Sequence, residues 1–432
     1  MIRRIKRLLP RPLINAYHFC RAVLAVALYG YPARRLTVIG VTGTDGKTTT
    51  SHMLYSILRQ AGHAVSLIST TGAVIYGSEN IPLGLHVTTP DPFELQRFLR
   101  DARRVGSDTI VLETTSHGLA QHRVWGCNYR VGVVTNITPE HLDYHGSYER
   151  LLRDKARLLR GVEASILNRD DSSHDALLPL ASGKIVTYGL STAAEVRAVK
   201  VQFDESRTSF EVPALDMIAR TRFLGDYNVL NALAAAAAAS ALGIEAERIS
   251  AGLAEAKPPP GRLEPVERGQ PFQVLVDFAH TSNSLENVLH LLRGLARKRL
   301  IVVFGCAGER DPGKRFPMGA SAGRWADLAV LTAEDPRTED LEAILDEIAR
   351  GVESQGGRLN ETYYRVPDRE QAIAFAILKL AKPGDIVVTC GKAHEKSMCY
   401  GAVEYPWDEF VAVHAALDRL ELETGPGEWE DD

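Results

Sequence analysis

Residues 36–50 read LTVIGVTGTDGKTTT and place an apolar run directly before a glycine-rich turn that ends in Lys47 and Thr48. This order predicts a buried strand, a loop and the first turn of a helix. Gly43 and Gly46 allow backbone N–H groups to close on phosphate oxygens, Lys47 supplies a mobile cation, and the Thr48 hydroxyl can ligate Mg²⁺. Nucleotide binding is therefore the first functional prediction.

The loop departs from the strict G-x-x-x-x-G-K-[ST] pattern, because Val41 stands where that pattern has its first glycine. A glycine-rich turn without a ligand is the alternative interpretation. It is the weaker one, since a lysine followed by three threonines at 48–50 serves no packing purpose.

Composition describes a globular chain without a general attraction for polyanions. Its 432 residues, 45% hydrophobic and 24% charged, suffice for two or three domains with a sizeable core. A formal net charge of −4 argues against nucleic acid as a partner. The five cysteines are odd in number and include no C-x-x-C pair, which argues against a disulfide framework and a zinc site and favours a reducing cytoplasm.

The N-terminal segment is strongly basic. His18 and Arg21 interrupt an apolar stretch over 13–29, which is short for a membrane span and is followed by no small-residue cleavage site. We therefore predict an amphipathic helix packed on the next domain, and favour it over membrane attachment, which stays open. Eight basic residues precede any acidic one: Arg3, Arg4, Lys6, Arg7, Arg11, Arg21, Arg34 and Arg35.

From residue 36 onward, short β-rich runs alternate with longer helical stretches, which is typical of an α/β fold with a mostly parallel sheet. The phosphate loop and the later loops would then gather at the carboxyl ends of the strands, where open parallel sheets bind ligands. The first predicted strands cover 36–40, 64–69, 109–113, 131–135 and 165–168, with helices over 48–61, 92–105 and 148–159.

Two changes of pattern divide the chain. Between 185 and 223 the runs shorten, which predicts an inserted antiparallel β lobe, and an alanine-rich helix over 228–242 follows. The stretch KPPPG at 257–261 breaks both periodicities and indicates a domain boundary. The predicted parts are a basic helical segment 1–35, a central nucleotide-binding domain 36–258, a second α/β domain 259–424 with strands over 274–277, 300–304, 328–332 and 386–389, and an acidic tail 425–432, expected to be disordered.

Polar residues follow the predicted strand ends of the first domain. Glu113 ends the third strand, from which a carboxylate can reach a metal on the phosphates, and His141 lies in the run TNITPEHLDYH at 135–145. Oxygen and nitrogen ligands of this kind suit Mg²⁺ or Mn²⁺. Taken alone, His141 is more often a hydrogen-bonded loop histidine, but together with Glu113 and Lys47 it becomes a candidate ligand.

Further motifs follow along the chain in a specific order. They are TGTDGKTT at 42–49, TTPDP at 88–92, ETTSHGLAQHR at 113–123, TNITPEHLDYHG at 135–146, RDKARLL at 153–159, LGDYNVLNA at 224–232, PGRLE at 260–264, DFAHT at 277–281, FGCAGERDPGKR at 304–315, EDPR at 334–337 and GKAHE at 391–395. In order and spacing they resemble the Mur ligase superfamily, and within it the MurE-type tripeptide synthetases, over residues 29–408.

The resemblance implies a central ATPase domain and a Rossmann-like C-terminal domain that closes over it. It also implies the reaction. A substrate carboxylate attacks the γ-phosphoryl group of ATP, and an amine then attacks the acyl phosphate, which releases phosphate and leaves an amide. Two anionic reactants must meet, so cations, Mg²⁺ and helix N-termini are needed. The implied pathway is cytoplasmic peptidoglycan precursor synthesis, and a monomer is expected.

The resemblance also implies roles for single residues. Lys155 matches a lysine that is carbamylated by CO₂, although by itself it would be interpreted as a solvated helix lysine. Thr48, Glu113 and His141 match Mg²⁺ ligands. The positions matched to ATP are Gly43, Thr44, Asp45, Gly46, Lys47, Thr48, Thr49, Asn228, Asn231, Asp277 and His280, and those matched to the muramyl-peptide acceptor are Thr88, Thr89, Thr115, Ser116, Gln121 and Arg123.

The identity of the added amino acid depends on the EDPR motif. Diaminopimelate-adding members have DNPR, whose arginine can pair bidentately with the distal carboxylate of meso-diaminopimelate. Arg337 keeps that guanidinium, whereas Asp335 replaces the usual asparagine and Ala393 the usual glycine. The alternative for Arg337 is an exposed turn arginine. The positions matched to the diamino acid are Arg310, Glu334, Asp335, Pro336, Arg337, Gly391 and Glu395.

Members of the superfamily ordinarily carry a complete UDP-binding domain before the ATPase domain, whereas only residues 1–35 precede the first predicted strand here. The resemblance therefore implies that this basic helical segment is a remnant of the UDP-binding domain. The expected acceptor is UDP-MurNAc-L-Ala-D-Glu. An L-lysine-adding ligase, a Mur-like ligase acting on a poly-γ-glutamate- or folate-like acceptor, and a non-catalytic nucleotide-binding scaffold stay open. The TTPDP and SHGLAQHR loops favour the muramyl peptide, and the retention of Lys47, Glu113, His141 and Lys155 favours an enzyme.

Overall fold

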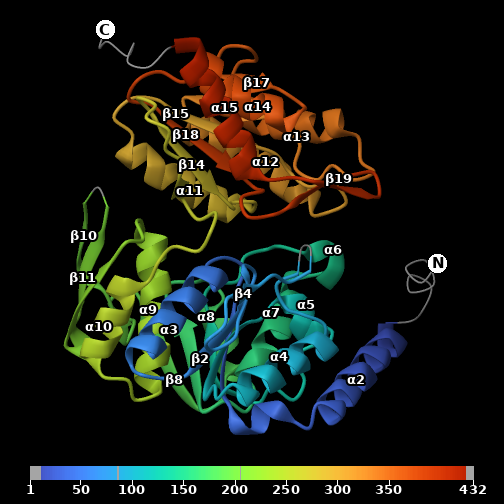
Figure 1. Cartoon of the computed structure of the whole chain (residues 1–432), viewed down its shortest axis with the longest axis vertical. Helices are drawn as coiled ribbons and strands as arrows, with labels where there is room; N and C mark the ends of the chain where they lie inside the picture. Colours follow the sequence, from blue (N-terminus) through green and yellow to red (C-terminus); the bar gives the residue numbers. More distant parts are fainter. Residues whose placement is uncertain (1–10, 85–86, 205, 425–432) are drawn as a thin grey trace. The chain divides into compact units, whose positions relative to one another are not determined.

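The computed structural model describes residues 11–84, 87–204 and 206–424, and the chain divides into two compact units after Pro259 (Figure 1). Sequence analysis predicted the boundary after residue 258. The predicted acidic tail 425–432 lies outside the described residues, as do residues 1–10. Within the described ranges, no helix is long and apolar enough to cross a membrane.

The first unit is built on a sheet of order β4-β3-β2-β5-β1-β6-β7-β8-β9. The seven strands β2, β5, β1, β6, β7, β8 and β9 run parallel to one another. Beyond β2, the strands β3 and β4 extend the sheet in antiparallel fashion. This parallel core brings the carboxyl ends of β2, β5, β1 and β6 to one edge of the sheet. The bounds are β1 Thr37–Thr42, β2 Val65–Ser69, β3 Gly72–Val74, β4 Asn80–Ile81, β5 Thr109–Glu113, β6 Tyr129–Val134, β7 Ala164–Asn168, β8 Lys184–Gly189 and β9 Val196–Arg197.

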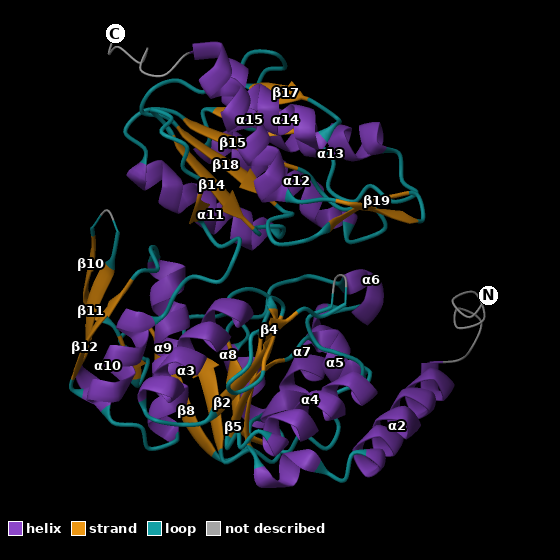
Figure 2. Ribbon diagram, in the orientation of Figure 1, coloured by secondary structure: helices purple, strands orange, loops and turns teal. Residues whose placement is uncertain are grey.

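Helices cover both faces of this sheet (Figure 2). Successive side chains of a strand point to opposite faces, so Ile39 and Val41 join one core cluster and Val38 another. Against the first cluster pack α3 (Lys47–Gln60), α9 (Asp226–Ala241) and α10 (Ala246–Glu255). The opposite face carries α4 (Pro92–Arg104), α5 (Ser116–Ala120) and α7 (Tyr148–Ala156). The short helical segments between them are α6 Leu142–His145, η2 Arg157–Leu159, α8 His174–Leu177 and η3 Leu178–Leu180.

Two additions flank this core. An antiparallel lobe of β10 (Val199–Phe203), β11 (Thr208–Val212), η4 (Pro213–Leu215) and β12 (Met217–Thr221) buries Phe210 and Ala219 in the first cluster. The lobe predicted over 185–223 was too long, because β8 and β9 pair in parallel within the main sheet. At the N-terminal side, α2 (Arg11–Leu28) packs on α4, and η1 (Pro32–Arg35) leads into β1.

The second unit has a sheet of order β13-β14-β18-β15-β16-β17, parallel except for β13. Leu300 and Val302 of β15 pack with α11, α12 and α13, while Ile301 and Val303 pack with α14, η6 and α15, so helices again cover both faces. The bounds are β13 Glu264–Pro265, β14 Gln273–Asp277, α11 Ser282–Leu295, β15 Leu300–Phe304, η5 Pro312–Lys314, α12 Arg315–Trp325, β16 Leu328–Leu331, α13 Leu341–Glu353, β17 Tyr363–Arg365, α14 Arg369–Phe375, η6 Ala376–Leu380, β18 Ile386–Cys390, β19 Ser397–Tyr400, β20 Val403–Pro406 and α15 Glu409–Thr424.

Candidate active site

The glycine-rich loop between β1 and α3 is held by residues that follow β6. Because β1 and β6 are parallel neighbours, the two loops leave the sheet side by side. Thr44 N donates to the Asn136 backbone oxygen at 2.8 Å, and Asp45 N donates to Asn136 Oδ1 at 2.9 Å. The Thr135 hydroxyl donates to Asp45 O at 2.6 Å. The loop is therefore rigid, and α3 begins directly behind it at Lys47, with Thr48 and Thr49 buried in its first turn.

Two glycines of the loop have no room for a side chain. Gly43 has φ 154° and a Cβ there would lie 1.8 Å from Thr135 Oγ1, while Gly46 has φ 80° and its Cβ would lie 2.2 Å from Asn231 Oδ1. Asn231 is itself buried in α9, where it accepts from Thr50 Oγ1 at 3.3 Å and donates to Asn228 Oδ1 at 3.1 Å. Asn228 and Asn231, two of the positions matched to ATP, thus form a hydrogen-bonded pair on α9 beside the loop.

Two lysine amines meet the loop at Thr44. Lys47 Nζ donates to Thr44 O at 2.7 Å, and Lys155 Nζ, from α7, donates to Thr44 Oγ1 at 3.3 Å. Lys155 is 3% exposed. Burial, and then the nearby positive charge of Lys47, lower the pKa of Lys155 from its ordinary 10.5 to about 7, against the opposing effect of the Glu140, Asp45 and Asp171 carboxylates.

The Glu113 carboxylate lies at the carboxyl end of β5, beside β1, and is 1% exposed. It accepts from Thr48 Oγ1 at 3.1 Å to each oxygen, from Thr70 N at 2.9 Å and from Thr70 Oγ1 at 2.9 Å. This oxygen-only group fits Mg²⁺, which binds through one or two carboxylates while phosphates and water complete its shell. Among the described residues, no cluster of three or more His, Cys, Asp and Glu side chains able to hold a metal occurs.

His141 belongs to a different group of side chains. Its ring lies edge-on to that of His117, with centroids 4.9 Å apart, and its Nε2 lies 3.5 Å from Glu140 Oε1. The ring of His117 also contacts Tyr144 at 4.2 Å between centroids. The structure therefore joins Thr48 to Glu113 directly and places His141 at the N-terminus of α6, with its side chain 36% exposed.

The predicted acceptor residues surround Glu113 and the start of α5. Thr88 Oγ1 lies 3.0 Å from Thr70 Oγ1, and Thr89 Oγ1 lies 3.1 Å from Thr115 Oγ1. Arg123 donates to Thr89 O at 2.9 Å and to Gln121 Oε1 at 2.7 Å, while burial lowers its pKa. Ser116 Oγ lies 3.0 Å from His145 Nε2, whose Nδ1 lies 2.9 Å from Asp154 Oδ2, so α5 is tied to the helix that carries Lys155.

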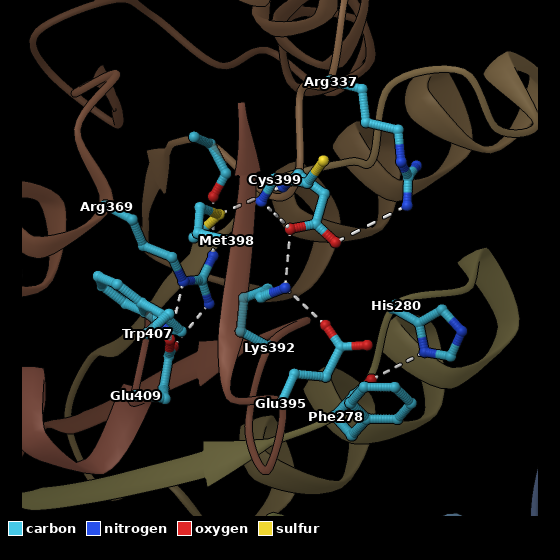
Figure 3. A network of polar contacts seen from close by, with 12 residues as sticks. Phe278, His280, Arg337, Arg369, Lys392, Glu395, Met398, Cys399, Trp407 and Glu409 are labelled. Atoms are coloured by element: carbon cyan, nitrogen blue, oxygen red, sulfur yellow. Dashed lines mark hydrogen bonds and ion pairs between the residues drawn. The ribbon is translucent and has the colours of Figure 1, made fainter. Parts of the chain in front are cut away.

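In the second unit, a fully buried lysine connects the two motifs assigned to the diamino acid (Figure 3). Lys392 Nζ donates to Asp335 Oδ1 at 2.9 Å and to Glu395 Oε2 at 2.6 Å. Burial disfavours its charge, but these two carboxylates outweigh that effect and raise the pKa of Lys392. Asp335 Oδ1 also accepts from Cys399 N at 2.9 Å. The charge that Asp335 adds to the motif is therefore paired inside the protein.

Arg337 is held beside this network. Its Nη1 donates to Gly308 O at 2.6 Å, and its Nη2 lies 3.9 Å from Asp335 Oδ2. The side chain is 15% exposed, so the alternative of an exposed turn arginine is wrong, because the turn folds against β19 and encloses it. Arg310, by contrast, is exposed on the loop after β15.

The backbone around the same network is strained. Asp335, Arg337 and Ala393 have φ of 45°, 53° and 39°, a region that non-glycine residues rarely occupy and that functional sites often retain. Gly391 has φ 108°, and a Cβ there would lie 2.5 Å from Glu334 Oε2. Burial raises the pKa of Glu334 to about 7. Pro336 completes the turn, and its carbonyl faces Gly308, where a Cβ would lie 2.0 Å away.

The two residues matched to ATP in the second unit are engaged in local structure. Asp277 is buried and accepts from Leu263 N and Ala279 N, each at 2.8 Å, and burial raises its pKa. His280 Nδ1 lies 3.0 Å from Phe278 O. Asp277 is the last residue of β14 and His280 follows it, so both lie at the carboxyl edge of the second sheet.

Three residues of these networks were not assigned by sequence analysis. Thr70 follows β2 and binds Glu113 through its backbone and its hydroxyl, Asn136 holds the phosphate loop, and Lys392 joins Asp335 to Glu395. Asn136 and Lys392 lie inside motifs that the sequence analysis quoted, and Thr70 stands at a strand end.

Family models for the Mur ligase middle domain and for the Mur ligase glutamate ligase domain match residues 41–239 and 261–393. The chain belongs to the Mur ligase family. The α/β fold and the family predicted from the sequence are thereby confirmed. Members of this family are ATP-dependent ligases that form C–N bonds.

Relatives support the same assignment along most of the chain. A UDP-N-acetylmuramyl-tripeptide synthetase of Roseiflexus sp. (strain RS-1) is 42% identical, over 92% of this chain and 82% of the relative. A UDP-N-acetylmuramoyl-L-alanyl-D-glutamate--2,6-diaminopimelate ligase of Geobacillus thermodenitrificans (strain NG80-2) is 39% identical over the same shares.

Solved structures agree with this assignment. One of a UDP-N-acetylmuramoyl-L-alanyl-D-glutamate 2,6-diaminopimelate ligase is 32% identical, with a TM-score of 0.60 over 89% of this chain and 78% of that one. A folylpolyglutamate synthase of Mycobacterium tuberculosis has a TM-score of 0.71 over 87% of this chain and 93% of that one. Its 18% identity makes that a likeness of fold alone.

Proposed function

We propose that this Mur ligase adds meso-diaminopimelate to the D-glutamyl carboxylate of UDP-MurNAc-L-Ala-D-Glu, using ATP and Mg²⁺. The observation that carries the proposal is the meeting of the glycine-rich loop, the Lys47 and Lys155 amines and the Thr48–Glu113 pair at the carboxyl edge of the first sheet. Cations and a metal-binding carboxylate at one loop are what phosphoryl transfer between two anions requires.

In this proposal the loop and the start of α3 hold the nucleotide. The backbone N–H groups of residues 46–49 at the α3 N-terminus face the phosphates, whereas those of Thr44 and Asp45 are held by Asn136. The Lys47 amine leaves Thr44 O to reach the phosphates. When bound, Mg²⁺ would neutralise charge on the phosphates, held by Thr48 and Glu113, with His141 assigned to a second ion. Asn228, Asn231, Asp277 and His280 are assigned to the adenosine part of ATP.

The acceptor residues position the reacting carboxylate. Thr89, Thr115 and Arg123 form one hydrogen-bonded group, and Thr88 lies within the Glu113 group. The D-glutamyl carboxylate oxygen attacks the γ-phosphorus of ATP, ADP leaves, and an acyl phosphate forms. The amine of the diamino acid then attacks the acyl carbon, and the phosphate leaves with the oxygen that came from the carboxylate.

Lys155 is proposed to act as a carbamate. Its lowered pKa means that much of the amine is neutral near pH 7, and a neutral amine adds CO₂ to give a carbamate anion and a proton. An anion at this buried position beside Lys47 and Thr44 would support the cations around the phosphates, in place of a second positive charge.

The second unit favours diaminopimelate over lysine. The pairing of Asp335 with Lys392 offsets the negative charge that distinguishes EDPR from DNPR. The enclosed Arg337 is then available, on leaving Gly308 O, to bind a distal carboxylate, and Glu395 can accept from a distal ammonium. Lysine has no carboxylate for Arg337. A cytoplasmic, monomeric enzyme is part of the same proposal, since its nucleotide substrates are cytoplasmic.

The test is phosphate release by the purified full chain over a matrix of amino acids and acceptors. We expect release that requires UDP-MurNAc-L-Ala-D-Glu and meso-diaminopimelate together, with L-lysine at least about tenfold less effective, since one charge-assisted pair is lost. Equal use of L-lysine would contradict the choice of amino acid. Phosphate release only with poly-γ-glutamate- or folate-like acceptors would contradict the choice of acceptor. If no amino acid stimulated phosphate release, the protein would be a non-catalytic nucleotide-binding scaffold.

A further inference from the structure

The helix α2 has apolar side chains on both of its faces. One face packs on the first unit, where Ala22, Ala25 and Val26 are fully buried and Val26 contacts Gly126. The opposite face is exposed, and its members recur every three or four residues, as one side of a helix does. This apolar stripe consists of Leu13, Ala16, Tyr17, Cys20, Leu24, Ala27 and Leu28.

The side chains of the apolar stripe are largely exposed, so they do not pack against the rest of the first unit. Leu13, Leu24 and Leu28 are 58%, 59% and 68% exposed, and Tyr17 is 50% exposed. A helix on the surface of a soluble domain normally turns polar residues outward, whereas a helix that is apolar all round is covered on every side. A contiguous exposed stripe of this kind therefore indicates a surface that something else covers.

The charge of the N-terminal segment points to the kind of partner that would cover the apolar stripe. Residues 1–44 contain eight basic and no acidic residues, although the chain as a whole is net acidic at −4. Arg3, Arg4, Lys6 and Arg7 precede the helix in sequence. At its other end Arg34 and Arg35 are exposed in η1, and the Arg34 guanidinium lies 4.3 Å from the ring centre of the half-exposed Tyr31. Positive charge thus follows the apolar stripe in η1 and precedes it in the sequence.

We propose that α2 binds the surface of an anionic lipid bilayer, lying flat with the apolar stripe in the acyl boundary and the basic residues at the headgroup phosphates. An apolar helix face combined with Lys and Arg, and with tyrosine at the boundary, is the pattern of interfacial helices. The helix lies on the membrane and does not cross it, because no described helix is long and apolar enough to span. Its other face keeps it attached to the catalytic unit.

A second copy of the chain is a poorer occupant of the stripe. Because basic residues flank the stripe on both sides in the sequence, pairing two α2 helices through the stripe brings like charges together in either a parallel or an antiparallel arrangement. Anionic lipid supplies both the apolar cover and the opposite charge. Neither the chemistry of the ligase nor the identity of its substrates enters this proposal.

The test is co-sedimentation of the full chain with vesicles of phosphatidylcholine alone or mixed with phosphatidylglycerol. We expect binding at least about tenfold tighter to the anionic vesicles, weakening as salt rises, because several Arg and Lys residues contribute. The variant Leu13→Gln/Leu24→Gln/Leu28→Gln should lose at least about tenfold in vesicle affinity, and Arg34→Gln/Arg35→Gln should weaken binding to the anionic vesicles only.

The matched control is Ile218→Gln/Val411→Gln/Leu422→Gln, which removes three exposed apolar side chains elsewhere and should bind vesicles like the unchanged protein. All variants should keep the thermal unfolding midpoint of the unchanged protein, since no buried group is altered. If a variant has a lowered midpoint, the salt dependence of vesicle binding by the unchanged protein serves as the test instead. Absence of binding to anionic vesicles would overturn the proposal. Vesicle binding by the stripe variant equal to that of the unchanged protein would also overturn it. So would a dimer of the unchanged protein that binds no lipid and that the stripe variant does not form.

Discussion

Lys155 shows how its place in the fold decides the chemistry of a side chain. In the sequence it is a helix lysine that follows Asp154 and lies two residues before Arg157, with nothing to distinguish it from a solvated lysine. In the structure it is 3% exposed and its amine lies 3.3 Å from Thr44 Oγ1, at the loop that Lys47 also contacts. Burial and the charge of Lys47 remove much of its preference for the protonated form.

Carbamylation of Lys155 should make phosphate release depend on bicarbonate. The pKa of about 7 lies below the ordinary 10.5, so the reactive neutral amine accumulates as pH rises through 7. Stimulation by bicarbonate should therefore grow between about pH 6 and about pH 8. Lys155→Ala should lower the rate at least about a hundredfold and lose the response. Lys184→Ala, on an exposed strand residue, is the control, and an unchanged bicarbonate response in Lys155→Ala would refute the role.

Individual contacts were the part of the site least predictable from the sequence. Glu113 and Thr48 were assigned to one metal, and they are hydrogen-bonded, because both stand at the ends of elements that any parallel sheet aligns. Thr70 was missed, because its contact with Glu113 depends on β2 lying next to β5, a neighbour relation that periodicity does not contain. The contact between Lys392 and Asp335 joins loops 57 residues apart, so it too required the fold.

At the scale of elements, the phosphate loop depends on a close approach of α9 to the start of α3. The alanine-rich α9 is buried nearly all round, so its backbone comes near the loop, and Asn231 presents its side chain there. Gly46 is the N-cap of α3 and has no space for a methyl group against Asn231. The glycine is therefore required by packing as well as by its φ of 80°.

Gly46→Ala should weaken nucleotide binding, and Gly62→Ala is its matched control. Both residues flank α3 with positive φ, 80° and 89°, so each substitution should cost about 1 kcal/mol of folding free energy. Only at position 46 would the new Cβ lie 2.2 Å from Asn231 Oδ1, whereas it meets nothing within 4 Å at position 62. Calorimetry should show ATP affinity lowered at least about tenfold in Gly46→Ala alone; equal losses in both variants would contradict this account of the loop.

Most long elements of the first unit were predicted, whereas the helices of the second unit and the short strands were not. β5 at Thr109–Glu113 and β15 at Leu300–Phe304 have the predicted bounds, since five consecutive buried residues give a clear apolar run. The edge strands β4, β9 and β13 have two residues each, too few for any period to appear, and were not predicted. The π-helical end of α14 at η6 also has no signal in the sequence.

At the scale of the whole molecule, each unit contributes one part of the proposed chemistry. The first unit gathers the phosphate loop, two lysines and a metal-binding carboxylate, and the second gathers a buried Asp335–Lys392–Glu395 network beside Arg337. The chain divides after Pro259, within the three consecutive prolines that interrupt both periodicities in the sequence. The exposed stripe of α2 was not predictable, since the sequence shows an apolar helix without showing which face is covered.

The central claim is that an acceptor carboxylate takes the γ-phosphoryl group of ATP before the amide forms. The most direct measurement uses UDP-MurNAc-L-Ala-D-Glu labelled with oxygen-18 in the D-glutamyl side-chain carboxylate, with meso-diaminopimelate and ATP, and mass analysis of the released phosphate. An acyl phosphate passes one carboxylate oxygen to phosphate, so each phosphate should carry one label and the amide should keep the other. Unlabelled phosphate, released while the amide forms, would contradict the account.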